Sequence, residues 1–256
     1  NSIGASDYSG RLFRVDASQA TGSQASTITH RIGISTTRNS APHADSRDMA
    51  FDSAGNLIES DDGGVYKRTS PRGLGDWESL IGNLQMTEFH SLQYDSASNR
   101  VIGGAQDTGT PYQSDANGAF DSLHTGDGGV VAIDTLTTGQ STRYTSFQNL
   151  GAFRRTVWNS SGTLISTAFP ALNPGSSARL SPQFYTPIQV NSVQPGGIAF
   201  AAANGVYISS NGGDSISLVA GGPSFGTAIA FGGTQGGVAN PDVLYVGDFS
   251  GLFVRT

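Results

Sequence analysis

The chain has 256 residues and a formal net charge of −6, with 35 glycines, 13% charged residues and no cysteine. The absence of cysteine excludes thiolate zinc sites, iron–sulfur clusters, thiol nucleophiles and disulfides. Only 14 lysines and arginines are present, which argues against nucleic-acid binding because neutralising phosphates needs concentrated positive charge. No apolar run approaches the roughly 20 residues of a membrane-spanning helix.

One pattern recurs along the chain: a β-rich run, a polar turn that ends in glycine, and an aromatic residue shortly afterwards. Glycine adopts positive φ without steric cost, so it allows two strands to reverse tightly. The copies are spaced at about 40–55 residues, which fits the blades of a β-propeller. Hairpins are predicted near residues 3–15, 57–69, 101–114, 144–158, 198–210 and 244–256. Their turn glycines are Gly10, Gly64, Gly109, Gly151, Gly205 and Gly251.

Further short strands flank these hairpins. Apolar runs upstream predict the innermost strand of each blade at residues 49–52, 92–95, 130–134, 188–190 and 228–231. More polar runs predict outermost strands at residues 77–80, 120–123 and 216–219, as expected for sheet edges that must resist aggregation. The aromatic residue after each turn is expected to pack between neighbouring sheets.

We therefore predict an all-β chain that forms a single β-propeller domain over residues 1–256, with about six (six to eight) four-stranded blades. The first blade lacks an inner strand and the last blade lacks an outer strand. Either the chain is a fragment of a longer polypeptide, which we favour, or another segment completes the ring. The rival architecture is an array of two sandwich domains, which would not require such regular hairpins.

Polar residues are predicted to gather on one face of the propeller. In a four-stranded blade, the loop before the innermost strand and the turn of the central hairpin open on the same side. The residues at these positions form the predicted binding set: His43, Asp45, Asp61, Asp62, His90, Gln106, Asp107, Asp127, Gln148 and Asn149. Each is also an ordinary loop or turn residue, so no single one identifies a site. Together they predict that this face binds a ligand.

The chemistry of this set leaves alternatives open. Four of its acids are hard oxygen ligands suited to Ca²⁺: Asp45, Asp62, Asp107 and Asp127. The sequence has no complete calcium-binding motif, and a transition-metal site that uses His43, Asp45 and His90 is less favoured. Two facing acids could instead hydrolyse glycosidic bonds. No nucleophile elbow or phosphate-binding loop is present.

Several motifs resemble the sortilin-like and Asp-box (BNR-like) repeat propellers of bacteria, a superfamily that includes xyloglucanase-type glycoside hydrolases. The matching residues are 43–45, 60–66, 77, 89–90, 101–109 and 126–134. The resemblance is specific over about residues 42–155 and implies a propeller in an exported protein. The Asp-box pattern Ser-x-Asp-x-Gly-x-x-Trp has no intact copy, and the nearest string, Ser209–Asp214, lacks its tryptophan. No catalytic residue is transferred from the xyloglucanases, which place their acids between two propellers.

We expect a secreted or cell-surface bacterial protein, because of the resemblance and the low-lysine, Ser/Thr/Gly-rich composition. Its expected role is that of a binding or structural propeller that recognises a glycan or a protein on its polar face, with Ca²⁺ as the candidate cofactor. The alternatives are a glycoside hydrolase that uses paired aspartates and an assembly module joined to further domains of the same polypeptide. Whether the chain is an enzyme stays open. Four aromatic residues are candidate glycan platforms, with core packing as their other use: Tyr8, Phe89, Phe147 and Phe249.

Overall fold

The computed structural model describes residues 10–29, 41–73, 75–83 and 87–256. Over these ranges the chain forms 21 β-strands and one short 3₁₀ helix, so the predicted all-β class is confirmed. None of the described helical structure has the length and apolar character needed to cross a bilayer. The chain divides into two compact units, unit 1 (Asn1–Met86) and unit 2 (Thr87–Thr256). The single domain over residues 1–256 stays a prediction.

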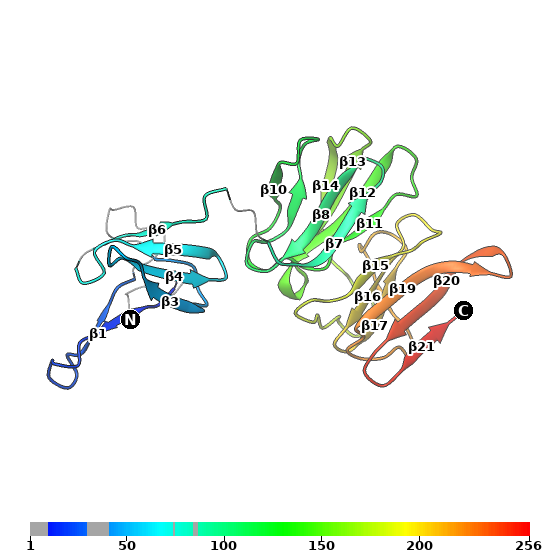
Figure 1. The fold of residues 1–256 in the computed structure, drawn as a ribbon. Helices are drawn as coiled ribbons and strands as arrows, with labels where there is room; N and C mark the ends of the chain where they lie inside the picture. The colour runs from blue at the N-terminus through cyan, green and yellow to red at the C-terminus, as the bar shows by residue number, and fades with distance from the viewer. Residues whose placement is uncertain (1–9, 30–40, 74, 84–86) are drawn as a thin grey trace. The chain divides into compact units, whose positions relative to one another are not determined.

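Unit 1 contains two antiparallel sheets, drawn in blue to cyan in Figure 1. The smaller sheet pairs β1 (Phe13–Val15) with β2 (Ala25–Thr27). The larger sheet follows the chain through β3 (Asp48–Phe51), β4 (Leu57–Asp61), β5 (Gly64–Arg68) and β6 (Trp77–Ser79). The β4–β5 hairpin is the one predicted near residues 57–69. Residues 1–9 of the first predicted hairpin lie outside the described residues.

Unit 2 contains four antiparallel sheets (Figure 1). The first runs through β7 (Phe89–Asp95), β8 (Arg100–Ala105), β9 (Pro111–Gln113) and β10 (Phe120–Ser122). The second runs through β11 (Ala132–Asp134), β12 (Gln140–Phe147), β13 (Gly151–Asn159) and β14 (Leu164–Ala168), with the 3₁₀ turn η1 (Gln148–Leu150) between β12 and β13. The third runs through β15 (Ile188–Val190), β16 (Ile198–Ala202), β17 (Gly205–Ser209) and β18 (Ser217–Leu218). The last has three strands, β19 (Ala228–Gln235), β20 (Val238–Gly247) and β21 (Leu252–Arg255).

The four sheets of unit 2 are blades of a β-propeller. In each of them, strands that follow one another in sequence are neighbours in the sheet. The first strands of successive sheets also contact one another, β7 with β11, β11 with β15 and β15 with β19. Meandering sheets that pack in series through their first strands are the defining feature of propellers. The predicted fold class is thereby confirmed.

The hydrophobic core of unit 2 lies between the blades. Phe153, which follows the β12–β13 turn, stacks on Tyr144 at a ring-centroid distance of 6.1 Å. Its edge meets Phe200 of the next sheet at 5.5 Å, and Tyr207 is completely buried in the same cluster. Burying such rings supplies much of the folding free energy, at about 25 cal/mol for each Å² of apolar surface. At these positions the predicted packing of post-turn aromatics is confirmed.

The turn glycines fulfil their predicted role only in part. Positive φ is found at Gly64, Gly109 and Gly205, whereas Gly151 has a φ of −62°. In that turn Asn149 takes the left-handed conformation instead, with a φ of 59°. The expectation of positive φ is therefore wrong for Gly151, and also for Gly10 and Gly251. Gly151 is required for space, because a Cβ here would collide with the ring of Phe147.

A buried ion pair links the first two blades of unit 2. Arg143 on β12 contacts the carboxylate of Asp95, the last residue of β7, at 2.6 Å, and both side chains are at most 1% exposed. The hydroxyls of Ser98 and Ser141 donate to the same carboxylate oxygen at 2.8 and 2.5 Å. The Arg143 guanidinium also lies 4.4 Å from the ring centroid of Trp158. Asp95 is therefore fully satisfied, and its role is structural.

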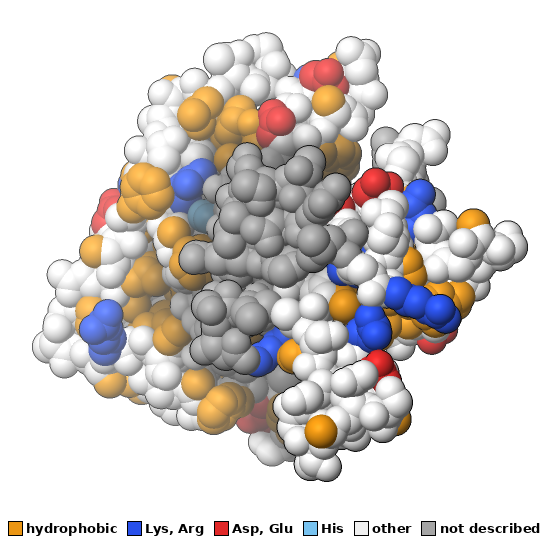
Figure 2. All heavy atoms as spheres, turned by 90° about the vertical axis from the view of Figure 1, so that its left-hand side faces the viewer, with side chains coloured by type: hydrophobic (Ala, Val, Ile, Leu, Met, Phe, Trp, Pro, Cys, Tyr) orange, Lys and Arg blue, Asp and Glu red, His pale blue; other side chains and the backbone are white. Residues whose placement is uncertain are grey.

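Much of the surface is uncharged. Figure 2 shows a face on which uncharged atoms and apolar side chains predominate and charged side chains are scattered among them. This agrees with the 13% of charged residues in the sequence. Exposed ion pairs contribute little to stability in general, so the sheets depend mainly on packing and hydrogen bonds.

Candidate functional site

The loops of unit 2 meet on one face, as the meander topology requires. Backbone hydrogen bonds join them: the N–H of Gln106 donates to the carbonyl of Glu88 (2.9 Å) and that of Gln148 to the carbonyl of Asp127 (2.8 Å). We use the name polar rim for Tyr185 together with the predicted residues of unit 2 that lie in these loops or, like His90, at the start of β7. The polar rim therefore consists of His90, Gln106, Asp107, Asp127, Gln148, Asn149 and Tyr185.

Tyr185, which sequence analysis missed, connects the polar rim. Its hydroxyl donates to Oε1 of Gln106 at 2.7 Å, and its ring lies 3.9 Å from that of His90, centroid to centroid. The Nε2–H of His90 donates to the carbonyl of Gly128, because a carbonyl can only accept. Burial, followed by the charges of nearby carboxylates, raises the pKa of Tyr185. The hydroxyl therefore stays protonated and acts as a donor.

Two polar-rim residues hold the loops in place. One carboxylate oxygen of Asp127 accepts from the backbone N–H of Asp107 at 3.0 Å, and Oε1 of Gln148 accepts from the N–H of Asp127 at 3.1 Å. Asp107 and Asn149 have positive φ values of 56° and 59°, which non-glycine residues rarely adopt. Such strained conformations concentrate at functional sites. Because they accept these backbone hydrogen bonds, Asp127 and Gln148 support the loops. Gln106 is half-buried and Asn149 is exposed, so their side-chain amides can be reached by a ligand.

The same face of unit 2 carries three exposed phenylalanines. Phe184 precedes β15, Phe225 precedes β19 and Phe249 lies in the β20–β21 turn, with 49%, 56% and 95% of their surfaces exposed. The N–H of Phe225 donates to the carbonyl of Ala202 at 3.1 Å, which ties its loop to the β16–β17 turn. We call Phe184, Phe225 and Phe249 the aromatic rim. Their position at the same end of neighbouring sheets makes them candidates for a binding surface, because contiguous exposed apolar side chains mark such surfaces.

Two other predicted aromatic platforms, Phe89 and Phe147, adjoin residues of the polar rim and do not belong to the aromatic rim. Phe89 is the first residue of β7, and a Cβ added at Gly103 would meet its ring. Phe147 is half-buried, and its ring lies 6.3 Å from that of His124. Tyr8 is outside the described residues. Of the four candidates, only Phe249 belongs to the aromatic rim.

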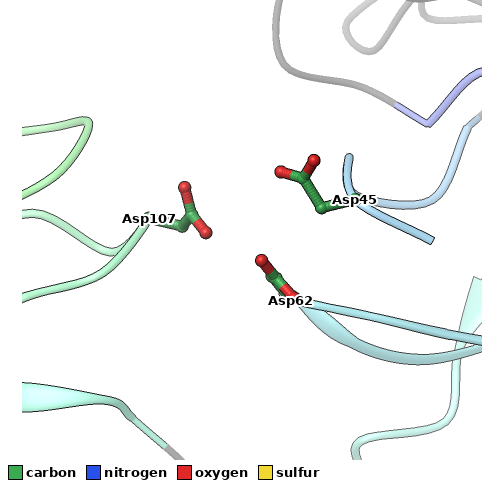
Figure 3. A group of neighbouring side chains, drawn as sticks. All are labelled: Asp45, Asp62 and Asp107. Atoms are coloured by element: carbon green, nitrogen blue, oxygen red, sulfur yellow. The ribbon is translucent and has the colours of Figure 1, made fainter. Parts of the chain in front are cut away.

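Four predicted site residues belong to unit 1: His43, Asp45, Asp61 and Asp62. Figure 3 shows that Asp45 and Asp62 come from separate loops; Asp107, also labelled there, is part of unit 2 and is described with it. Both oxygens of Asp62 accept from Arg47, its Nε and one terminal nitrogen, at 2.8 Å each. A cation would therefore compete with this guanidinium for Asp62. The predicted calcium ligands Asp45, Asp62, Asp107 and Asp127 stay a prediction.

Unit 1 also contains a buried pair of acids, one of which sequence analysis missed. Glu59 is completely buried and Asp61 is 9% exposed, on the face of β4 that Leu57 shares. One oxygen of Asp61 accepts from the N–H of Gly63 at 2.8 Å. Its other oxygen and both oxygens of Glu59 have no hydrogen-bond partner among the described residues. Burial, aided by the neighbouring Asp61 charge, raises the pKa of Glu59 to about 7, and burial also raises the pKa of Asp61.

No protein-family model matches this chain, and no curated protein does. Among solved structures, an ancestral GH74 enzyme is similar over 79% of this chain (TM-score 0.41, 14% identity) and the GH74 xyloglucanase from Xanthomonas campestris over 90% (0.42, 14%). A chain of a mitotic checkpoint complex is similar over 96% (0.40, 12%). This chain spans 27%, 38% and 70% of those chains, respectively. At these scores the likenesses carry no inference about activity, and the sortilin-like or Asp-box resemblance stays a prediction.

Proposed function

We propose that this protein binds carbohydrate through the face of unit 2 that carries the polar rim and the aromatic rim. The observation that supports the proposal is the combination, on one face, of amide and carboxylate groups with exposed phenylalanine rings. A sugar offers hydroxyl groups around its ring and C–H groups on its faces. Polar side chains bond the hydroxyls, and aromatic rings cover the C–H faces, as in ligand sites that combine apolar walls with a few polar groups.

The two rims meet at Phe184 and Tyr185. These consecutive residues place their rings edge to face at a centroid distance of 4.8 Å. Because the Tyr185 hydroxyl donates to Oε1 of Gln106, the amide nitrogen of Gln106 is oriented to donate to a ligand. The N–H of Asn149 donates to the carbonyl of Phe184 at 2.8 Å. The exposed ring of Phe184 is thus connected to Gln106 and Asn149 by hydrogen bonds and a ring contact. One sugar unit could contact the ring with its C–H face and the two side-chain amides with its hydroxyl groups.

Isothermal titration of the purified chain with a panel of plant and microbial polysaccharides tests this proposal. Phe184→Ala should weaken the Kd for the bound polysaccharide at least tenfold, because it removes the ring at the junction of the two rims. Phe120→Ala is the matched control: Phe120 has the same exposure, 49%, but lies on the outermost strand β10. Equal effects of the two substitutions, or no binding to any polysaccharide in the panel, would overturn the proposal.

The placement of Asp107 and Asp127 on adjacent loops favours hydrolysis of a glycosidic bond as a second candidate function, in which the loop-supporting Asp127 would also act on the substrate. The two acids come from adjacent loops, and the backbone N–H of Asp107 donates to the Asp127 carboxylate. Paired carboxylates are the usual machinery for this reaction. Release of reducing ends from a bound polysaccharide, abolished in Asp107→Asn with binding retained, would establish an enzyme. Binding without release would leave the carbohydrate-binding role alone.

A further inference from the structure

Glu59 and Asp61 place two carboxyl groups inside unit 1, and among the described residues neither of them forms an ion pair with a lysine or arginine. His43 is the basic side chain that lies near Asp61. Arg68 is the buried cation on the neighbouring strand β5. It pairs across the sheet with Leu57, and its guanidinium donates to the carbonyls of Gly75 and Gly73 at 2.7 and 3.1 Å. Arg68 therefore serves the β5–β6 turn and makes no described contact with the two acids.

The other positive charges near this sheet are also engaged. Lys67 is the cross-strand partner of Ile58, so it lies on the opposite face of the sheet from Tyr66, the partner of Glu59. Its ammonium group lies 3.6 Å from the carboxylate of Glu78. Arg47 holds both oxygens of the exposed Asp62. Two uncompensated buried carboxylates are unfavourable, since desolvation and mutual repulsion both oppose ionisation. A pair in this position needs either a proton or a bound cation.

Apart from the imidazole of His43, the polar groups named near the pair carry oxygen atoms, which hard cations prefer. Both oxygens of Glu59 and one oxygen of Asp61 are without hydrogen-bond partners in the described part of the chain. The Ser46 hydroxyl lies close enough to Glu59 to lower its pKa, and the carboxyl groups of Glu59 and Asp61 lie close enough to affect each other's pKa. His43 lies near Asp61, and its Nδ1 is 3.3 Å from the carbonyl of Ala44. Carboxylate and hydroxyl oxygens are typical ligands of Ca²⁺.

We propose that Glu59 and Asp61 form a buried binding site for a divalent, oxygen-preferring cation, with Ca²⁺ as the best-fitting ion. The site uses an unpartnered, completely buried carboxylate that the sequence-predicted calcium set does not include. Its role is structural, since a cation here joins the β4–β5 hairpin to the loop that carries His43 and Ser46. The inference is independent of carbohydrate binding by unit 2, so either can fail without the other.

Calcium titration of the chelator-treated full chain tests the site. We expect one Ca²⁺ to bind, and Tb³⁺ at the same site to luminesce on excitation of aromatic side chains, because Tyr66 is the cross-strand neighbour of Glu59. Glu59→Gln, which keeps the shape and removes the charge, should weaken Ca²⁺ binding at least tenfold and remove the luminescence. Asp62→Asn is the matched control: it neutralises an exposed acid one residue beyond β4 and should change the Kd less than twofold.

Three outcomes would overturn the proposal. The first is the absence of Ca²⁺ binding at millimolar concentration in the wild-type chain, which would mean that the pair holds a proton. The second is loss of binding in Asp62→Asn with retention in Glu59→Gln, which would place the ion among the exposed acids. The third is retention of full affinity in Asp61→Asn. Circular dichroism of each variant checks that the sheets are formed, and Asp61→Asn provides a second test if Glu59→Gln does not fold.

Discussion

Asp95 of unit 2 and Glu59 of unit 1 are both completely buried acids, but their surroundings have opposite effects. Burial alone would raise the pKa of Asp95, yet hydrogen bonds from Ser141, Arg143 and Ser98 and the charge of Arg143 lower it overall. Glu59 has no arginine partner among the described residues, and burial raises its pKa to about 7 although the Ser46 hydroxyl opposes the shift. Burial therefore does not distinguish a structural acid from a candidate site. The partners of the carboxylate do.

The largest effect that we predict comes from breaking the satisfied pair. Arg143→Met should lower the free energy of unfolding by about 3–5 kcal/mol, because it leaves the Asp95 charge buried without a counter-ion. Urea denaturation at pH 7 measures the change. Arg255→Met removes an ion pair of similar length, 2.5 Å to Asp242, whose side chains are 34% and 64% exposed. This control should cost less than about 1 kcal/mol. Equal losses would show that burial does not set the strength of these pairs.

A buried histidine extends the comparison to a base. His124 in unit 2 is 7% exposed, and its Nε2 lies 3.1 Å from the hydroxyl oxygen of Thr145. Burial, and then the charge of Arg154, lower its pKa to about 4, against about 6.5 in an unfolded chain. Between these values the unfolded chain binds more protons. The stability that neutral His124 contributes is therefore fully present above about pH 6.5 and is lost as the pH falls towards 4.

This difference in pKa corresponds to about 3 kcal/mol between pH 7 and pH 4. Urea denaturation of the wild type and of His124→Gln across that range isolates the contribution, because other titrating groups are common to both proteins. The wild type should lose more stability than the variant as the pH falls. Parallel curves would contradict the assignment.

Glu59→Gln should have the opposite sign to Arg143→Met. In the absence of divalent cations, we expect the variant to be about 2–3 kcal/mol more stable than the wild type at pH 8. The reason is that the folded chain must then hold an ionised, unpartnered Glu59 whose pKa is about 7, whereas the unfolded value is about 4.3. The gain should disappear below about pH 4.3, where the carboxyl is protonated in both states. A variant less stable than the metal-free wild type at pH 8 would refute this account.

The blade pattern could be read from sequence because it is local. Strand, glycine turn and aromatic residue lie within about a dozen positions, and the hairpins from residue 57 onward form as predicted. Strands β2 and β14 were missed because their residues, Ala25–Thr27 and Leu164–Ala168, are largely exposed. Their side chains do not alternate between buried and exposed positions, so the sequence shows no two-residue hydrophobic period there.

The candidate sites were less predictable because their partners are distant in sequence. Tyr185 bonds Gln106 across 79 positions, and neither residue type signals the other. Glu59 did leave a signal: Leu57, Glu59 and Asp61 alternate in β4, so an acid occupies an apolar register. Whether such an acid is neutralised depends on where the neighbouring cations point. Arg68 points to the β5–β6 turn, which no local pattern reveals.

The smallest effect that we predict tests whether a short, well-aligned ion pair stabilises the fold when it is exposed to water. Arg47 and Asp62 form a two-pronged ion pair at 2.8 Å, as short as most contacts of Arg143, but the Arg47 side chain is 66% exposed. Water and salt screen such a pair. Arg47→Met should therefore cost less than about 1 kcal/mol in urea denaturation at 50 mM NaCl, and the difference should vanish at 1 M NaCl. A loss as large as that of Arg143→Met, or one that is insensitive to salt, would mean that short contacts alone stabilise this fold, and the distinction between Asp95 and Glu59 would lose its physical basis.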